Sequence, residues 1–259
     1  MNLAFSEFGA GTPLVILHGL FGGARNWARI ARDLATRFHV YAVDLPNHGE
    51  SPWVDSVTYE GMAEAMAEFL RARGIAGGVT LLGHSMGGKV AMTLALTSPG
   101  DVARLIVVDI APVAYDHART NRHILEALRS LPLAGLASRK EADAALAPAI
   151  PDPMLRSFLL ANLSRDDDRF VWRINLDGLA NSLPALHGFP QFPPEARYDG
   201  PTLFIAGERS DYVGDADVAT IRKRFPNARI ETLPGAGHWV HADAPDAAVR
   251  LVSEFIRGD

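Results

Sequence analysis

A serine with small neighbours lies between a predicted strand and a predicted helix. Residues 83–87 read Gly-His-Ser-Met-Gly, which is the pattern Gly-x-Ser-x-Gly with Ser85 at its centre. The apolar run 79–82 precedes this segment, and the helix-forming run 88–96 follows it. In a nucleophile elbow the serine occupies a sharp strand-to-helix turn, and glycines two positions away let strand and helix approach closely. The pattern predicts a nucleophilic Ser85, with simple helix capping as the alternative role.

The same segment nearly matches a phosphate-binding loop. Gly83, Gly88 and Lys89 have the spacing of Gly-x-x-x-x-Gly-Lys-Ser/Thr, but the next residue is Val90. Valine has no hydroxyl group that could coordinate magnesium, so we do not expect a nucleotide site here. We expect Lys89 to be a solvated residue of the predicted helix.

A serine nucleophile needs a base that accepts its proton. His238 lies in a glycine-rich loop after the last predicted strand, and it matches the chain order Ser, acid, His. His241 is the alternative base. The spacing His238-x-x-His241 also occurs at metal sites, but no matching cluster exists elsewhere, so we expect no metal and no cofactor. We expect His84 to pack beside the sheet and His48 to belong to a turn near the pocket rim.

An acyl intermediate also needs hydrogen-bond donors for its oxyanion. Residues 18–23 read His-Gly-Leu-Phe-Gly-Gly and leave the end of a predicted strand as a glycine-rich turn. From this turn the backbone N–H of Leu20 could point at the same space as that of Met86, the residue after the serine. We expect these two groups to form an oxyanion hole. The alternative is a strand-exit turn whose glycines are only structural.

A third residue, an acid, must hold the imidazole in the right tautomer. Asp109 follows the apolar run 105–108, and Asp211 follows the apolar run 201–206. Either carboxylate could instead cap neighbouring backbone N–H groups. The residues alone leave both aspartates open as the triad acid.

Short apolar runs position these side chains. In the first half of the chain they end in glycine or aspartate, and they comprise residues 14–17, 40–43, 79–82 and 105–108. Without polar alternation, such runs are typical of strands buried on both faces. The segments between them have helical spacing of apolar residues. This alternation predicts an α/β fold, a mostly parallel central sheet with helices on both faces.

The alternation stops after Pro112 and resumes at residue 201. The intervening residues contain helix-like stretches punctuated by prolines, and no buried strand is evident among them. We expect an inserted helical cap, residues 113–198, between a first core part, residues 1–112, and a second, residues 199–259.

Within this predicted cap, Leu155, Phe158 and Leu159 could line a pocket above Ser85 or only pack the cap. The acidic run Asp166-Asp167-Asp168 is expected to be a solvated turn.

Composition excludes several other functions. The 259 residues contain no cysteine, 25 basic and 30 acidic side chains, which give a net charge of −5. Disulfides, thiolate metal sites and a cysteine nucleophile are therefore excluded. The charge balance argues against nucleic acid or a membrane surface as a partner. Residues 1–7 lack a basic stretch followed by an apolar core, so we expect a cytoplasmic protein.

Five motifs in order along the chain resemble the α/β-hydrolase superfamily. They are His-Gly-Leu-Phe-Gly at 18–22, Asp-Leu-Pro-Asn-His-Gly-Glu-Ser at 44–51, Gly-His-Ser-Met-Gly-Gly-Lys at 83–89, Val-Asp-Ile-Ala-Pro at 108–112 and Gly-His-Trp-Val-His-Ala at 237–242. Within the superfamily the chain resembles the small bacterial YbfF-like esterases. This resemblance implies cofactor-free hydrolysis of carboxylic esters or acyl thioesters beneath a helical cap. It also implies an acid after the earlier strand, which favours Asp109 over Asp211.

The leading interpretation is therefore a serine hydrolase that cleaves esters or thioesters of small to medium acyl groups through an acyl-enzyme. The alternative is a lyase or carbon-carbon bond hydrolase of the same fold that uses the same Ser-His pair, because fold and triad do not determine the bond that is broken. A non-enzymatic binding protein would be expected to have lost part of the triad. A dehalogenase or epoxide hydrolase would carry an aspartate in place of Ser85.

Overall fold

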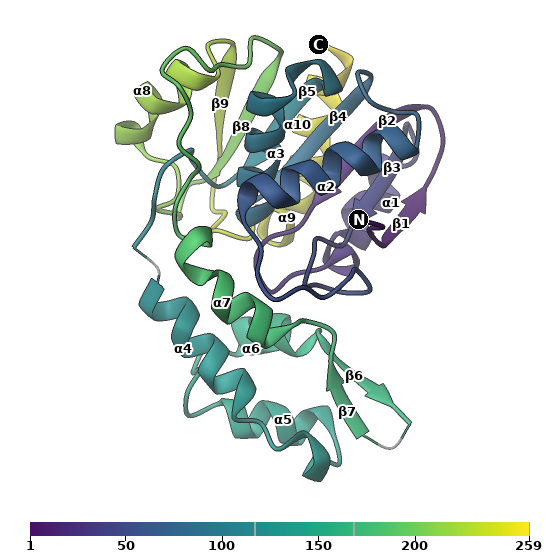
Figure 1. The fold of residues 1–259 in the computed structure, drawn as a ribbon, viewed down its shortest axis with the longest axis vertical. Helices are drawn as coiled ribbons and strands as arrows, with labels where there is room; N and C mark the ends of the chain where they lie inside the picture. The colour runs from purple at the N-terminus through teal and green to yellow at the C-terminus, as the bar shows by residue number, and fades with distance from the viewer. Residues whose placement is uncertain (117, 168, 259) are drawn as a thin grey trace.

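Seven strands form one sheet in the computed structural model, which describes residues 1–116, 118–167 and 169–258 (Figure 1). Their spatial order is β1 (Phe5–Phe8), β3 (Phe38–Val43), β2 (Thr12–Leu17), β4 (Val79–His84), β5 (Val102–Val108), β8 (Thr202–Gly207) and β9 (Ala228–Leu233). Each neighbouring pair is parallel except β1 with β3. The predicted α/β-hydrolase fold with a mostly parallel sheet is confirmed, and β1 is an antiparallel edge strand that the sequence analysis did not predict.

Strand register brings the functional loops to one edge of the sheet. Leu17, at the end of β2, is paired with Gly83 of β4, and His84 at the end of β4 is paired with Val108 of β5. The residues after these parallel strands therefore emerge side by side. Ser85, Asp109 and the turn that starts at His18 all begin at this edge.

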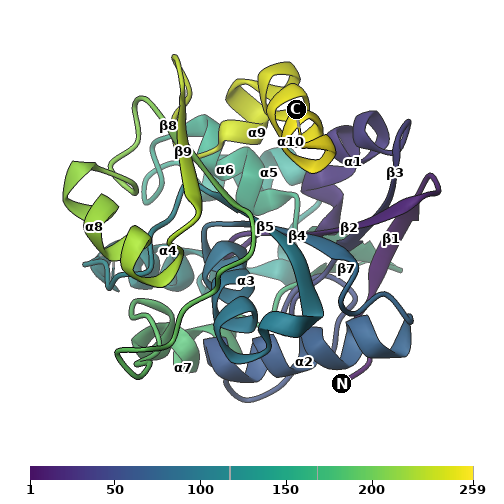
Figure 2. The ribbon, with the colours of Figure 1, turned by 90° about the horizontal axis from the view of Figure 1, so that it is seen from above.

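Helices cover both faces of the sheet (Figure 2). One face carries α2 (Tyr59–Ala72), α3 (Met86–Thr97) and α8 (Asp215–Arg224), and the other carries α1 (Ala28–Leu34) and α10 (Pro245–Arg257). A short helix, α9 (Val240–Asp243), precedes α10, and three 3-10 turns lie at Ala24–Trp27, Pro99–Asp101 and Leu133–Gly135. Each face has its own apolar core because strands buried on both sides need cover on both sides.

Local sequence explains where these helices begin and end. The Thr58 side chain caps α2 by accepting the N–H of Gly61 at 3.1 Å. Gly258 ends α10 with φ of 82°, in the left-handed region that glycine adopts readily. No helix in the described part of the chain has the length and apolar character required to cross a membrane.

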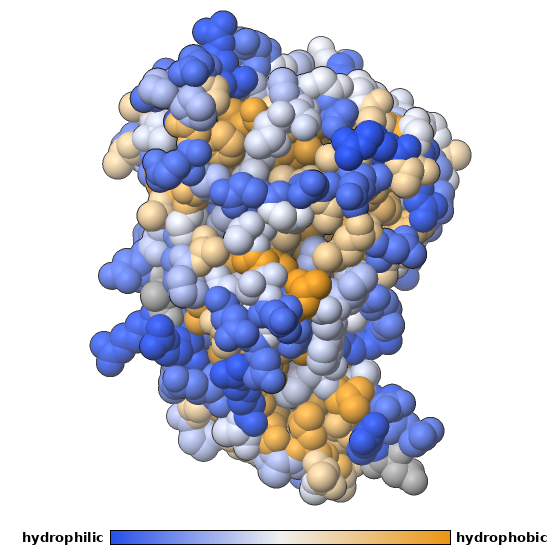
Figure 3. Space-filling model, in the orientation of Figure 1, coloured by the Kyte–Doolittle hydropathy of each residue, from blue (hydrophilic) through white to orange (hydrophobic). Residues whose placement is uncertain are grey.

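Residues between the two core parts form a separate group below the sheet in Figure 1. It contains α4 (Ala118–Arg129), α5 (Arg139–Leu146), α6 (Pro153–Leu160) and α7 (Leu176–Leu186). These helices share an apolar cluster with its own buried residues, including Leu128, Leu159 and Leu179. Figure 3 shows apolar side chains gathered at the level where this group meets the sheet part.

One feature of this group differs from the sequence analysis. A hairpin of β6 (Leu163–Asp166) and β7 (Arg169–Trp172) is present where no strand was predicted. Its strands have only four residues each, too few to produce a clear pattern. Asp166 and Asp167 are exposed at its turn, as expected, and Asp168 lies outside the described residues.

Candidate active site

Ser85 lies at a sharp turn between β4 and α3. Its φ is 52°, in the left-handed region that costs energy for a residue with a side chain. A Cβ atom on Gly83 would lie 2.2 Å from the carbonyl oxygen of Gly87, and one on Gly87 would lie 2.5 Å from that of Leu17. Only glycine fits at either position, so the Gly-x-Ser-x-Gly pattern follows directly from the backbone geometry.

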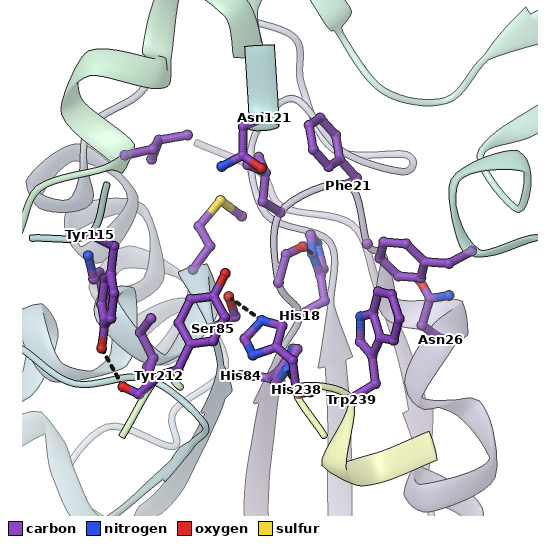
Figure 4. A pocket seen from close by; sticks show the side chains of 18 of the residues that line it. His18, Phe21, Asn26, His84, Ser85, Tyr115, Asn121, Tyr212, His238 and Trp239 are labelled. Atoms are coloured by element: carbon purple, nitrogen blue, oxygen red, sulfur yellow. Dashed lines mark hydrogen bonds between the residues drawn. The ribbon is translucent and has the colours of Figure 1, made fainter. Parts of the chain in front are cut away.

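A chain of hydrogen bonds joins Ser85, His238 and Asp109. Nε2 of His238 lies 3.1 Å from Oγ of Ser85 (Figure 4). Nδ1 of His238 lies 2.7 Å from Oδ2 of Asp109. These residues come from the elbow, the loop after β9 and the end of β5. The structure thus brings together the three residues that the sequence analysis favoured. Asp211, the alternative acid, is solvent-exposed, and Asp109 occupies the position beside Nδ1.

The Asp109 carboxylate is completely buried and held by its own donors. Its Oδ1 accepts the backbone N–H of Gly207 at 2.8 Å, and its Oδ2 accepts the hydroxyl of Ser210. Hydrogen bonds to the ionised form stabilise a buried carboxylate. Sequence reasoning missed Ser210, because nothing in its neighbourhood marks it as a partner of a residue 101 positions earlier.

Aromatic rings surround the His238 imidazole. The Tyr212 ring is stacked on it, with centroids 4.0 Å apart and planes 21° from parallel. On another side, Nε2 of His84 donates to the backbone carbonyl of His238 at 2.8 Å. His84 is buried, and desolvation, with His238 and His241 nearby, holds its pKa well below the usual value. It therefore stays neutral and anchors the His238 loop to β4, which agrees with the expected packing role.

His241, the alternative base, lies in a different setting. Its ring is stacked on Trp27 with centroids 4.2 Å apart, and desolvation lowers its pKa to about 4. Nδ1 of His241 is buried without a hydrogen-bond partner in the described part of the chain. Within that same part, no group of three or more His, Cys, Asp or Glu side chains is arranged to hold a metal ion.

Two more buried histidines hold the glycine-rich loop after β2. Nε2 of His18 accepts the N–H of Leu45 at 3.0 Å, and Nε2 of His48 accepts the N–H of Phe21 at 3.3 Å. Desolvation lowers the pKa of His18 to about 4 and that of His48 to about 3, so both act as neutral acceptors. His48 thus supports the loop from behind, next to the pocket.

The backbone N–H group of Phe21 is hydrogen-bonded to His48, whereas those of Leu20 and Met86 are not bonded within the described residues. Both Leu20 and Met86 line the pocket at Ser85. Donors without an internal partner at such a place are available to a ligand oxygen.

A pocket of about 290 Å³ opens beside Ser85 and His238. Core and insertion both line it, and Figure 4 shows Tyr115 and Trp239 on opposite sides of the Ser85–His238 pair. Of Leu155, Phe158 and Leu159, for which either a pocket-lining or a packing role was left open, the first two line the pocket. Leu159 does not: it is completely buried in the apolar cluster of the insertion.

Lys89 also lines this pocket, and the expectation that it is solvated was wrong. Only 2% of Lys89 is exposed, because α3 is buried over almost its whole length between the sheet and α2. The signal was available: residues 86–96 have no polar face, so a lysine among them must be buried.

A family described as the alpha/beta hydrolase fold matches residues 12–245. The chain belongs to this α/β-hydrolase family. The hydrolase is 39% identical over 267 residues to the sn-1-specific diacylglycerol lipase ABHD11 of Danio rerio, covering 99% of this chain and 83% of the relative. It is 34% identical over 245 residues to the esterase YbfF of Escherichia coli, covering 95% and 93%.

A solved structure has the same fold and is also named as an esterase. A marine microorganism esterase superposes on the hydrolase with a TM-score of 0.94 and 39% sequence identity, over 98% of each chain. The resemblance to YbfF-like esterases is confirmed, and the chain is an enzyme of the carboxylic ester hydrolase type.

Proposed function

We propose that this hydrolase cleaves carboxylic esters and acyl thioesters through an acyl-enzyme on Ser85. The observation that carries the proposal is the continuous hydrogen-bond chain from Ser85 Oγ through His238 to the buried Asp109 carboxylate. A neutral imidazole that donates from Nδ1 to a carboxylate has Nε2 free to accept the serine proton.

In the first half of the proposed reaction, His238 Nε2 takes the Ser85 proton while Oγ attacks the carbonyl carbon of the substrate. The resulting oxyanion accepts hydrogen bonds from the N–H groups of Leu20 and Met86. The imidazolium, stabilised by Asp109, then gives its proton to the leaving alkoxide or thiolate. The carbon-oxygen or carbon-sulfur bond breaks and the acyl group remains on Oγ.

In the second half, water replaces the alcohol or thiol. His238 removes a proton from water, hydroxide attacks the acyl carbon, and the same two N–H groups stabilise the second oxyanion. The proton returns from His238 to Oγ as the carboxylic acid leaves. No step needs a cofactor or a metal ion.

We further propose that residues 113–198 act as a cap between the core parts 1–112 and 199–259. The cap helices contribute Ile124, Leu155, Phe158 and Leu186 to the pocket, and the pocket volume of about 290 Å³ favours small to medium acyl groups. The names of the relatives, a lipase and an esterase, support an ester as the substrate.

A substrate panel tests the bond that is broken. Ethyl and 4-nitrophenyl esters of two to eight carbons should be hydrolysed, with matching acyl thioesters also turned over and vinylogous 1,5-diketones left intact. The Ser85→Ala variant should lose activity by on the order of 10⁶-fold and keep its fold. Cleavage of the diketone without ester hydrolysis would contradict the proposal and favour a carbon-carbon bond hydrolase.

A further inference from the structure

The Lys89 ammonium group is an unusual component of an apolar pocket. Lys89 lies in the first turn of α3, four residues after Ser85, and lines the same pocket. Its Nζ donates to the backbone carbonyl of Gly188 at 2.5 Å and lies 4.8 Å from the ring centroid of Tyr115 and 5.5 Å from that of Tyr59. An ammonium group has three protons to donate, so this environment provides one oxygen acceptor and two aromatic faces.

Among the residues that the structure describes, no carboxylate balances this charge. None of the ion pairs in the described residues involves Lys89. Among those residues the buried acidic side chains are Asp44 and Asp109, and Asp109 is bonded to His238. A buried cation without a counter-charge is costly. Accordingly, desolvation lowers the pKa of Lys89 to about 7.

Other polar side chains gather around Lys89. Tyr115, Thr120, Asn121 and His187 line the same pocket. His187 directly precedes Gly188, whose carbonyl group Lys89 contacts. The N–H of Tyr115 donates to the backbone carbonyl of His187 at 2.9 Å, which places Tyr115 next to the same segment. Nδ2 of Asn121 lies 3.4 Å from Nε2 of His187. This end of the pocket is therefore polar, at the place where the chain enters and leaves the insertion.

The rest of the pocket wall is apolar. It is lined by Phe21, Leu155, Phe158 and Trp239. The ring centroids of Phe158 and Trp239 lie 5.6 Å apart. A ligand that contacts both the apolar wall and the polar end with Lys89 carries an apolar part and an anionic group. Ser85 and Lys89 line the same pocket of about 290 Å³, so a group held by Lys89 shares a small space with an acyl carbon on Ser85.

We propose that Lys89 binds a carboxylate on the acyl part of the substrate, which makes monoesters or monothioesters of short dicarboxylic acids the preferred substrate class. This inference rests on the proposed function, and it specifies the substrate of the same site. The substrate carboxylate supplies the counter-charge that the described residues do not provide. Lys89 is thus a specificity-determining residue, while its bond to Gly188 holds the ammonium group at the pocket wall.

The test compares monoethyl glutarate with ethyl pentanoate. The two esters have acyl groups of the same length, but only monoethyl glutarate carries a free carboxylate. We expect the wild-type kcat/KM for the monoanion to equal or exceed that for the neutral ester. The Lys89→Met variant removes the charge at similar side-chain size, and it should lower the ratio of the two kcat/KM values by about 10- to 100-fold. The ratio cancels any general damage to the active site.

Thr93→Val is the matched control. Thr93 lies one turn further along α3, is equally buried, and donates its hydroxyl to the Lys89 carbonyl without lining the pocket. Its kcat/KM ratio should stay within about twofold of wild type.

Binding supplies a second readout that needs no hydrolysis. Glutarate should bind the Ser85→Ala protein in calorimetry, and the Ser85→Ala/Lys89→Met protein at least about tenfold more weakly. Glutarate binding without any ester hydrolysis would support the Lys89 site and overturn the proposed function. Hydrolysis of ethyl pentanoate with a wild-type ratio below about 1, or a ratio that Lys89→Met leaves unchanged, would overturn the Lys89 proposal alone. The wild-type ratio and glutarate binding decide the question even if the Lys89 variant does not fold.

Discussion

At the scale of single residues, the hydrogen bond between His238 and Asp109 has the clearest measurable consequence. Asparagine at position 109 keeps the size of aspartate but removes its charge and can favour the wrong imidazole tautomer. We expect Asp109→Asn to lower kcat by about 10⁴-fold on an activated ester, with the fold retained by circular dichroism. The matched variant Asp211→Asn changes an exposed carboxylate and should cost less than about tenfold. The reverse order of losses would identify Asp211 as the acid.

Some site residues could be predicted from sequence because they sit in local patterns. Ser85 lies in a pentapeptide that the backbone requires, and His238 follows the last strand. Asp109 and Asp211 could not be separated by spacing, since both follow core strands. Only three-dimensional geometry reveals Ser210 and Tyr212, which contact Asp109 and His238 from a loop with no motif of its own.

At the scale of elements, the elbow depends on close contact between backbones. A methyl group on Gly83 would lie 2.2 Å from the Gly87 carbonyl oxygen and 2.7 Å from Cα of Gly88, and these atoms cannot move aside cheaply. We expect Gly83→Ala to lower the free energy of unfolding by about 3 kcal/mol in urea titrations and to reduce activity strongly. Gly100→Ala is the control, because a Cβ there would meet nothing within 4 Å. Equal free energies of unfolding for the two variants would contradict the close contact between Gly83 and the backbone of Gly87 and Gly88.

Elements with long periodic patterns were predictable, and short ones were not. The buried strands β2, β3, β4 and β5 match runs of apolar residues in the sequence, and α2 lies where apolar residues have helical spacing. The β6–β7 hairpin has too few residues for its period to be recognised. Within α6, the sequence does not show which residue turns toward the pocket: Phe158 does, whereas its neighbour Leu159 is buried in the apolar cluster of the insertion.

At the scale of the whole molecule, four buried histidines should make the fold sensitive to acid. Burial lowers the pKa of His18 and His241 to about 4 and of His48 to about 3, and holds that of His84 well below its usual value. Between pH 6.5 and about 4 the unfolded chain therefore binds protons that the folded chain does not. The resulting stabilisation is fully present above pH 6.5 and is lost as the pH falls through the folded pKa values.

We expect the free energy of unfolding to fall by up to about 5 kcal/mol per pH unit near pH 5, because each histidine contributes about 1.4 kcal/mol per unit. Denaturant unfolding between pH 4.5 and 7.5 measures this slope. His241→Phe keeps a ring stacked on Trp27 but removes one titrating group. It should therefore reduce the pH dependence of the free energy of unfolding by about 1.4 kcal/mol per pH unit. A stability that does not change over this range would contradict the neutral buried histidines.

The central claim is that Ser85 alone is the activated nucleophile. The most direct measurement is labelling with a fluorophosphonate probe, followed by peptide mapping by mass spectrometry and assay of the residual esterase activity. We expect one adduct per chain, on the peptide that contains Ser85, with activity lost in proportion to labelling and no labelling of Ser85→Ala. An adduct on another serine, or an enzyme that remains fully active after Ser85 is modified, would contradict the account.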